Sequence, residues 1–123
     1  MIYRTLGNTG IQAGVIGIGT EHLDGQTYEV IEQVIGAADA AGINMMDLFM
    51  PGEEVRRHIG RALKGRRQRF HIQGAIGSVD LREQYDISRD LDTCKRYFEA
   101  LLRALDTDYI DFGMFFFMDT EEA

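Results

Sequence analysis

The sequence has a single cysteine, a single proline and no tryptophan in 123 residues. One cysteine, Cys94, cannot form a disulfide within the chain, and it cannot supply the several thiolates of a cysteine-built metal site or of an iron–sulfur cluster. The sequence contains 14 glycines but only one proline, and it has no stretch rich in proline and serine. This combination predicts tight turns and close backbone approaches rather than disordered linkers.

Long apolar runs and an excess of basic residues are also missing. No run approaches the roughly 20 apolar residues of a membrane-spanning helix, and no signal peptide is recognisable at the start of the chain. The 20 acidic residues outnumber the 13 basic ones, and the net charge of -7 argues against nucleic-acid and anionic membrane partners. We therefore expect a cytoplasmic protein with one domain over residues 1–123.

Short apolar stretches alternate with stretches of helical period along the chain. Residues 2–15 predict a β-hairpin, and residues 77–87 predict a polar loop. Buried strands are expected at residues 15–20, 42–47, 70–75 and 109–117. Helices are expected from Tyr28, from Glu53 and after Ser88, with Ser88 as the N-cap of the last helix.

The helical stretches also predict which side chains are buried. The first buries Val30, Ile31, Val34, Ile35 and Ala38, the second Val55, Ile59, Ala62 and Leu63, and the third Leu91, Cys94, Phe98, Leu101, Leu102 and Leu105. Cys94 is therefore interpreted as a core thiol rather than a nucleophile. Four basic residues of the second helix are interpreted as its solvated face and basic end rather than a phosphate clamp: Arg56, Arg57, Arg61 and Lys64.

The order of these elements predicts an α/β fold in which a hairpin cap, residues 1–15, precedes a βαβαβαβ unit over residues 16–123. Helices that alternate with nearly continuous apolar strands indicate a parallel sheet covered by helices. Gly17 and Gly19 alternate in the first buried strand, where another backbone or a ligand would pass close. They do not form a dinucleotide fingerprint, because the third glycine is missing and no helix follows at once.

Asp47 is the candidate functional residue that stands out. It follows a short buried strand, and the carboxyl ends of such strands carry the chemistry of barrels and doubly wound folds. The alternative interpretation is that Asp47 only caps the next turn, where aspartate is common.

Several stretches in the same order together resemble the aldo-keto reductase family. They are Tyr3-Arg4-Thr5-Leu6-Gly7, Gly17-Ile18-Gly19-Thr20, Ala41-Gly42-Ile43-Asn44-Met45-Met46-Asp47, Ile59-Gly60-Arg61-Ala62-Leu63 and Asp108-Tyr109-Ile110-Asp111. Three further stretches are similar to a bacterial branch whose members often continue into a C-terminal iron–sulfur segment: Thr20-Glu21-His22-Leu23, Asp47-Leu48-Phe49-Met50-Pro51 and Ile72-Gln73-Gly74.

This resemblance implies a (β/α)8 barrel that reduces carbonyls with NADPH. A barrel of that type needs about 250 residues, so the chain corresponds to an incomplete, N-terminal half of one, a truncated form. Gly19, Thr20 and Asp47 would face the cofactor. Because the second half of the family barrel holds most of the cofactor, NADPH is not expected to bind this chain alone.

The family site combines an aspartate, a tyrosine, a lysine and a histidine, and the resemblance places only the first of them in this chain. Asp47 matches the aspartate, whereas Gly52, Ala75 and Phe116 stand where the tyrosine, the lysine and the histidine are expected. Carbonyl reduction needs a proton donor beside the hydride acceptor, and none of these three side chains is one. His22 is the best-placed remaining proton carrier, although it also fits a solvated loop histidine.

Three interpretations of function remain open. The chain is an aldo-keto reductase-like oxidoreductase fragment that is inactive alone, or a non-catalytic protein of the same ancestry that binds copies of itself or a partner. A third is an unrelated small α/β binding domain. An isolated half-barrel leaves both edge strands unpaired, including the apolar residues 112–117, which predicts self-association or binding of a missing C-terminal half.

Overall fold

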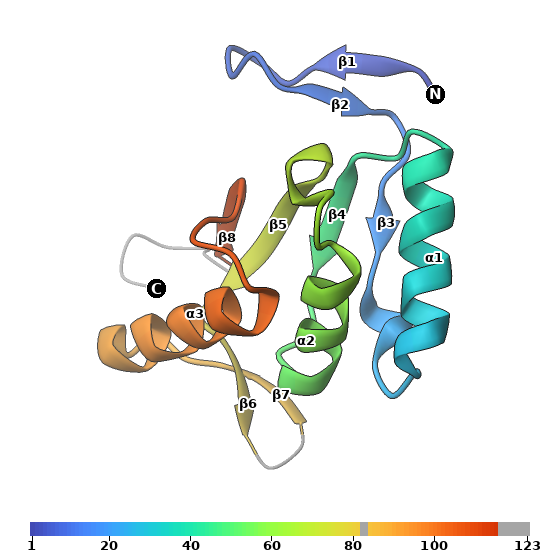
Figure 1. The fold of residues 1–123 in the computed structure, drawn as a ribbon. Coiled ribbons are helices and arrows are strands. Elements are labelled where there is room, and N and C mark those ends of the chain that lie inside the picture. Colours follow the sequence, from blue (N-terminus) through green and yellow to red (C-terminus); the bar gives the residue numbers. More distant parts are fainter. Residues whose placement is uncertain (82–83, 116–123) are drawn as a thin grey trace.

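The computed structural model describes residues 1–81 and 84–115 of the chain. The elements follow one another as β1 (Tyr3–Thr5), β2 (Gln12–Gly14), β3 (Ile18–Gly19), the 3-10 turn η1 (Glu21–Leu23), α1 (Tyr28–Ala40), β4 (Met45–Leu48), α2 (Glu53–Ala62), η2 (Arg67–Arg69), β5 (His71–Ile76), β6 (Ser78–Leu81), β7 (Gln84–Ile87), α3 (Leu91–Leu105) and β8 (Phe112–Phe115) (Figure 1).

Four of the strands form one parallel sheet in the order β3-β4-β5-β8. The three α-helices lie together on one face of this sheet (Figure 1). The predicted α/β fold, a hairpin followed by βαβαβαβ, is therefore confirmed. Its sheet is open rather than closed into a barrel, as expected for half of one.

The face of the sheet that meets the helices holds the apolar core. Met46, Leu48 and Ile72 alternate with the residues of the opposite face, and their side chains are buried against the helices. The core is completed by Ile31 and Ile35 from α1, Val55 and Ile59 from α2, and Leu101 and Leu105 from α3. Alternation leaves Met45, Asp47, Gln73 and Gly19 of β3 on the concave face, which the helices do not cover.

The N-terminal hairpin crosses the sheet at the amino ends of its strands (Figure 1). Tyr3 Oη donates a hydrogen bond of 2.7 Å to the carbonyl oxygen of Gly42, which ends α1. The Asn44 side chain accepts from Gly14 N at 2.8 Å and donates to Gln12 O at 2.7 Å. Gly42 has a φ of +75°, and a Cβ there would lie 2.7 Å from Tyr3 Oη, so both the helix end and the hairpin contact require glycine.

The polar loop predicted over residues 77–87 is wrong, because the structure has an antiparallel hairpin there. Gly77 has a φ of +84° and redirects the chain from β5 into β6, which pairs with β7 from Ser78↔Ile87 to Leu81↔Gln84. Ser88 is not the N-cap of α3; Asp90 is, and its Oδ1 accepts a hydrogen bond of 2.8 Å from Thr93 N. Hydrogen bonds from Thr93 lower the pKa of the Asp90 carboxyl.

Several predictions of which helix residues are buried or exposed are wrong. Arg56 is not solvated: only 3% of it is exposed, and its Nε donates to the carbonyl oxygen of Met50 at 2.9 Å. Leu91 is 64% exposed, and Val30 and Val34 are exposed as well. These three apolar residues lie outside the core that the helices share with the sheet. Cys94 is partly buried and its Sγ contacts Ser88 O at 3.3 Å.

Of the helices in the described part of the chain, none combines the length and the apolar character that a bilayer span requires.

Candidate functional site

Asp47 lies near the carboxyl end of β4, on the concave face of the sheet. Its main-chain oxygen accepts two hydrogen bonds from Thr20, one from the backbone N at 3.2 Å and one from Oγ1 at 2.7 Å. Thr20 follows β3 directly, and only 1% of it is exposed. The short strand β3 and its buried threonine therefore fix the position of the strand end that carries Asp47.

The Asp47 carboxylate is held by an amide from the next strand. Gln73 Nε2 donates to Asp47 Oδ1 at 3.1 Å, and the same nitrogen lies 3.8 Å from Met114 Sδ on β8. Gln73 was not among the site residues predicted from the sequence. The parallel register pairs Asp47 with Gln73, and residues paired across parallel strands share a face. The sequence could not predict this partner, because no local pattern in the sequence shows which residues of β4 and β5 lie side by side.

A pocket of about 320 Å³ opens in front of this carboxylate. It is lined by Gly17, Ile18, Gly19, Met45, Met46, Asp47 and Gln73. A Cβ on Gly17 would lie 3.3 Å from the Met45 backbone oxygen, which confirms the predicted close approach of another backbone. A Cβ on Gly19 would meet nothing within 4 Å, so the space above Gly19 belongs to the pocket.

Two of the three positions at which the family resemblance expects the tyrosine, the lysine and the histidine lie in the described part of the chain. Gly52 is the N-cap of α2 in the loop after β4, and a Cβ there would lie 3.4 Å from Asp24 Oδ1. Ala75 is buried on β5 and pairs with Met114. Neither position brings a proton donor to Asp47. Phe116, at the expected histidine position, lies outside the described residues.

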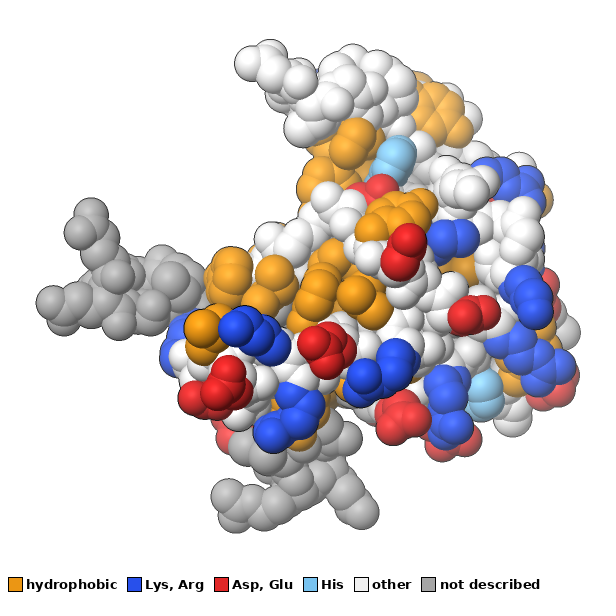
Figure 2. Space-filling view, turned by 60° about the vertical axis from the view of Figure 1, so that its left-hand side comes forward, with side chains coloured by type: hydrophobic (Ala, Val, Ile, Leu, Met, Phe, Trp, Pro, Cys, Tyr) orange, Lys and Arg blue, Asp and Glu red, His pale blue; other side chains and the backbone are white. Residues whose placement is uncertain are grey.

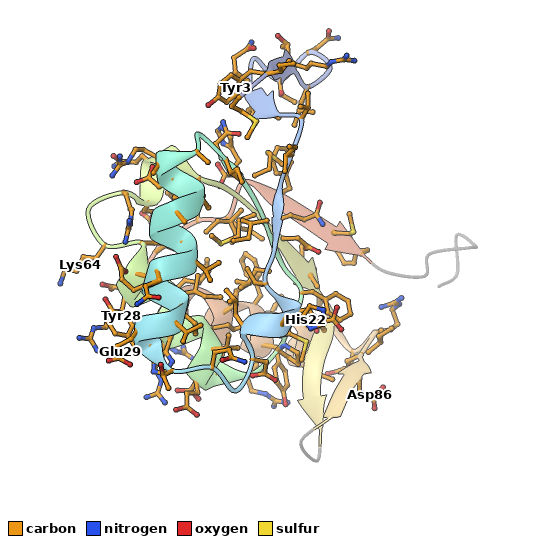
Figure 3. The ribbon with its side chains drawn as sticks, turned by 90° about the vertical axis from the view of Figure 1, so that its right-hand side faces the viewer. Tyr3, His22, Tyr28, Glu29, Lys64 and Asp86 are labelled. Atoms are coloured by element: carbon orange, nitrogen blue, oxygen red, sulfur yellow. The ribbon has the colours of Figure 1, made fainter. Side chains whose placement is uncertain are left out.

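Among the described residues, no hydrogen bond or ion pair joins His22 to Asp47. His22 is exposed in η1, at the end of the sheet opposite Tyr3 of the hairpin (Figure 3). Within the described ranges it makes no hydrogen bond or ion pair. Its role as a proton carrier therefore stays a prediction.

A second polar cluster lies at the amino ends of β5 and β8. Asp111 Oδ2 accepts hydrogen bonds from Ile72 N at 2.9 Å and from Arg67 Nη2 at 3.1 Å, and Asp111 Oδ1 lies 3.2 Å from His71 Nδ1. Burial raises the pKa of the Asp111 carboxyl, but the hydrogen bonds from Ile72, His71 and Arg67 outweigh it and hold that pKa below its ordinary value. In barrels this end of the strands serves stability rather than chemistry.

Among the described residues, no three His, Cys, Asp or Glu side chains gather in a way that could hold a metal ion.

Three solved structures that share this fold are described as aldo-keto reductases. A proposed aldo-keto reductase from Pseudomonas aeruginosa has 23% sequence identity and a TM-score of 0.82, with 93% of this chain and 46% of that protein covered. An aldo-keto reductase from Bacillus halodurans in its holo form has 26% identity and a TM-score of 0.82, with 94% and 40% covered. An aldo/keto reductase from Klebsiella pneumoniae in complex with NADP and acetate has 21% identity and a TM-score of 0.59, with 85% and 35% covered.

The predicted resemblance to the N-terminal half of aldo-keto reductases is confirmed by these structures at the level of the fold. The chain spans less than half the length of each of these three proteins. No protein-family model matches the sequence, and no curated protein matches it.

Proposed function

We propose that this chain supplies the first half of a carbonyl-reducing oxidoreductase barrel and that it does not reduce carbonyls by itself. The observation that supports this proposal is that Asp47 lies near the carboxyl end of β4 in the open sheet, while the family resemblance assigns the acid and the base to positions that hold Gly52 and Ala75. A carboxylate alone offers no proton to a carbonyl oxygen. The acid that completes the reaction would therefore come from residues beyond those described here.

The described residues do not by themselves fit NADPH, which supports this proposal. The pocket lining contains no lysine or arginine for the phosphate groups. Thr20 already donates its hydroxyl to the carbonyl oxygen of Asp47 and is buried, so it is not available to a ligand. Gly19 and Asp47 remain as the surfaces that a nicotinamide ring could touch.

The test is to incubate the chain with NADPH and an aromatic aldehyde and to follow nicotinamide fluorescence and absorbance. We expect neither a change in fluorescence nor oxidation of NADPH. Turnover that is lost in Asp47→Asn and kept in Asp86→Asn, which changes an exposed carboxylate on β7, would contradict the proposal.

A second candidate function is association through the open edges of the sheet. β3 and β8 occupy the two outer positions, and among the described strands none pairs with their outer edges. Val15 and Ile16 beside β3 are exposed, and Phe115 on β8 is 56% exposed. Figure 2 shows apolar side chains gathered on the face that carries β8 and α3. Unpaired apolar edges of this kind favour pairing with another chain.

This candidate predicts that the chain self-associates as its concentration rises, which light scattering measures. Phe115→Glu places a charge on the edge and is expected to weaken the association. Ile2→Glu is the matched control, because Ile2 is also an exposed apolar residue but lies on the hairpin side. A compact monomer at every concentration would rule out association through the edges.

A further inference from the structure

The Asp47 pocket presents hydrogen-bond acceptors and no cation, which is an unusual combination for a half-buried carboxylate. We propose that this pocket binds a small organic ammonium ion, whose N–H groups donate to Asp47 and Gln73. The inference concerns the same pocket as the proposed function but does not depend on carbonyl reduction or on NADPH.

Two acceptor atoms of the pocket remain open. Asp47 Oδ1 receives the amide of Gln73, whereas Asp47 Oδ2 accepts no hydrogen bond from any residue that the structure describes. The partners of Gln73 Nε2, a carboxylate oxygen and a thioether sulfur, are both acceptors, so the amide nitrogen must face them. Gln73 Oε1 is therefore left to accept from a ligand, and it makes no hydrogen bond within the described ranges.

A positive charge is missing from the lining. None of the lining residues is lysine, arginine or histidine. His71 lies two residues before Gln73 on β5, but its Nδ1 is directed to Asp111 at 3.2 Å. Ala75 lies two residues after Gln73, at the position where the family resemblance places a lysine. A partly buried carboxylate without a cationic partner loses solvation, and a cationic ligand restores the missing interaction.

The size and the walls of the pocket restrict the ligand further. A volume of about 320 Å³ lies at the small end of ligand sites. Met45 supplies an apolar wall on the concave face, and methionine adapts readily to aliphatic chains. An ammonium head with a short aliphatic chain satisfies both the acceptors and the walls, whereas an anion would be repelled by Asp47.

The first experiment is an NMR titration of the chain with n-butylammonium and, as its neutral isostere, with 1-butanol. We expect saturable shifts of the Gly19 and Asp47 amides and of the Gln73 side-chain amide with the amine. The alcohol should bind about tenfold more weakly, because it lacks the charge-assisted hydrogen bond. Equal binding of the amine and the alcohol would overturn the proposal, as would shifts confined to residues outside the pocket.

Two pairs of variants locate the binding. Asp47→Asn is expected to abolish the preference for the amine, whereas Asp86→Asn removes an exposed carboxylate elsewhere and should leave it unchanged. Ala75→Lys places a cation two residues after Gln73 on the same face of β5 and should displace the amine, whereas Ala75→Met adds a long side chain without charge and should not. Retention of amine binding in Asp47→Asn would overturn the proposal even if Ala75→Lys fails to fold, which the NMR spectrum reports directly.

Discussion

Replacing Asp111 with asparagine is expected to lower the free energy of unfolding by about 3 kcal/mol. The Asp111 carboxylate accepts from the backbone N of Ile72 and from Arg67, and it also contacts His71. An asparagine would turn an NH2 group toward one of these donors and would leave the half-buried Arg67 without its counter-charge. Urea denaturation of the variant measures the loss.

The matched control is Asp108→Asn, because Asp108 is an exposed aspartate in the same segment before β8. It is expected to change the free energy of unfolding by less than about 0.5 kcal/mol. Equal effects of the two substitutions would show that the Asp111 contacts do not stabilise the chain.

The Asp111 contribution should also depend on pH in a defined direction. Hydrogen bonds from Ile72, His71 and Arg67 outweigh burial and hold the folded-state pKa of Asp111 below its ordinary value of 3.8. The folded state then binds the proton more weakly than the unfolded state, so this stabilisation is complete above that ordinary value and is lost as the pH falls through the lower folded-state pKa. The difference between the native chain and Asp111→Asn should therefore shrink in acid. A difference that stays constant down to acid pH would contradict this account.

Replacing Gly60 with alanine is expected to lower the free energy of unfolding by about 2 kcal/mol, although alanine is the better helix former. Gly60 lies in α2 where that helix meets the end of α3. A Cβ there would lie 2.6 Å from the Leu105 carbonyl oxygen and 2.7 Å from its Cα. These are backbone atoms that cannot rotate away, so the two helices would have to separate.

Gly36→Ala in α1 is the matched control for Gly60→Ala. A Cβ on Gly36 would meet only Arg66 Nη1 at 3.6 Å, an ordinary contact. The substitution is expected to raise the free energy of unfolding by up to about 1 kcal/mol, because alanine restricts the unfolded chain and favours the helix. Urea denaturation of both variants measures these two changes in the free energy of unfolding, which are expected to have opposite signs. A gain of stability in Gly60→Ala would contradict a tight contact between α2 and α3 at this position.

Local patterns in the sequence were enough to predict most of the element order. The helical period over residues 28–41, the glycines that end α1 and α2, and the apolar strand before Asp47 are each visible within a few residues. The N-cap of α3 could not be predicted in this way. Ser88 and Asp90 are both residue types that cap helices, and only the structure shows that Asp90 is the N-cap. The strands of the β6–β7 hairpin do alternate polar and apolar residues, Ser78-Val79-Asp80-Leu81 and Gln84-Tyr85-Asp86-Ile87, but each has only four residues, which is at the lower limit for a strand pattern.

The candidate site likewise has one residue that the sequence predicts and one that it does not. Asp47 could be found from its place at the end of a buried strand. Its partner Gln73 could not, because the two residues meet only through the register of β4 and β5. Arg56 likewise reads as a surface residue of a basic helix, yet the loop before α2 folds back so that the carbonyl oxygen of Met50 receives its Nε.

The sequence alone determined an α/β chain with a hairpin cap, a parallel order of strands and a carboxylate, Asp47, at a strand end, because these features depend on local period and on residue type. The resemblance to a family added the expectation that the acid and the base of its site are replaced in this chain. Only the tertiary structure decided how far the sheet extends, which edges stay open, and that Asp47 is held by an amide in a pocket without a cation. Those features depend on register and on contacts between segments far apart in the chain, which no local pattern encodes.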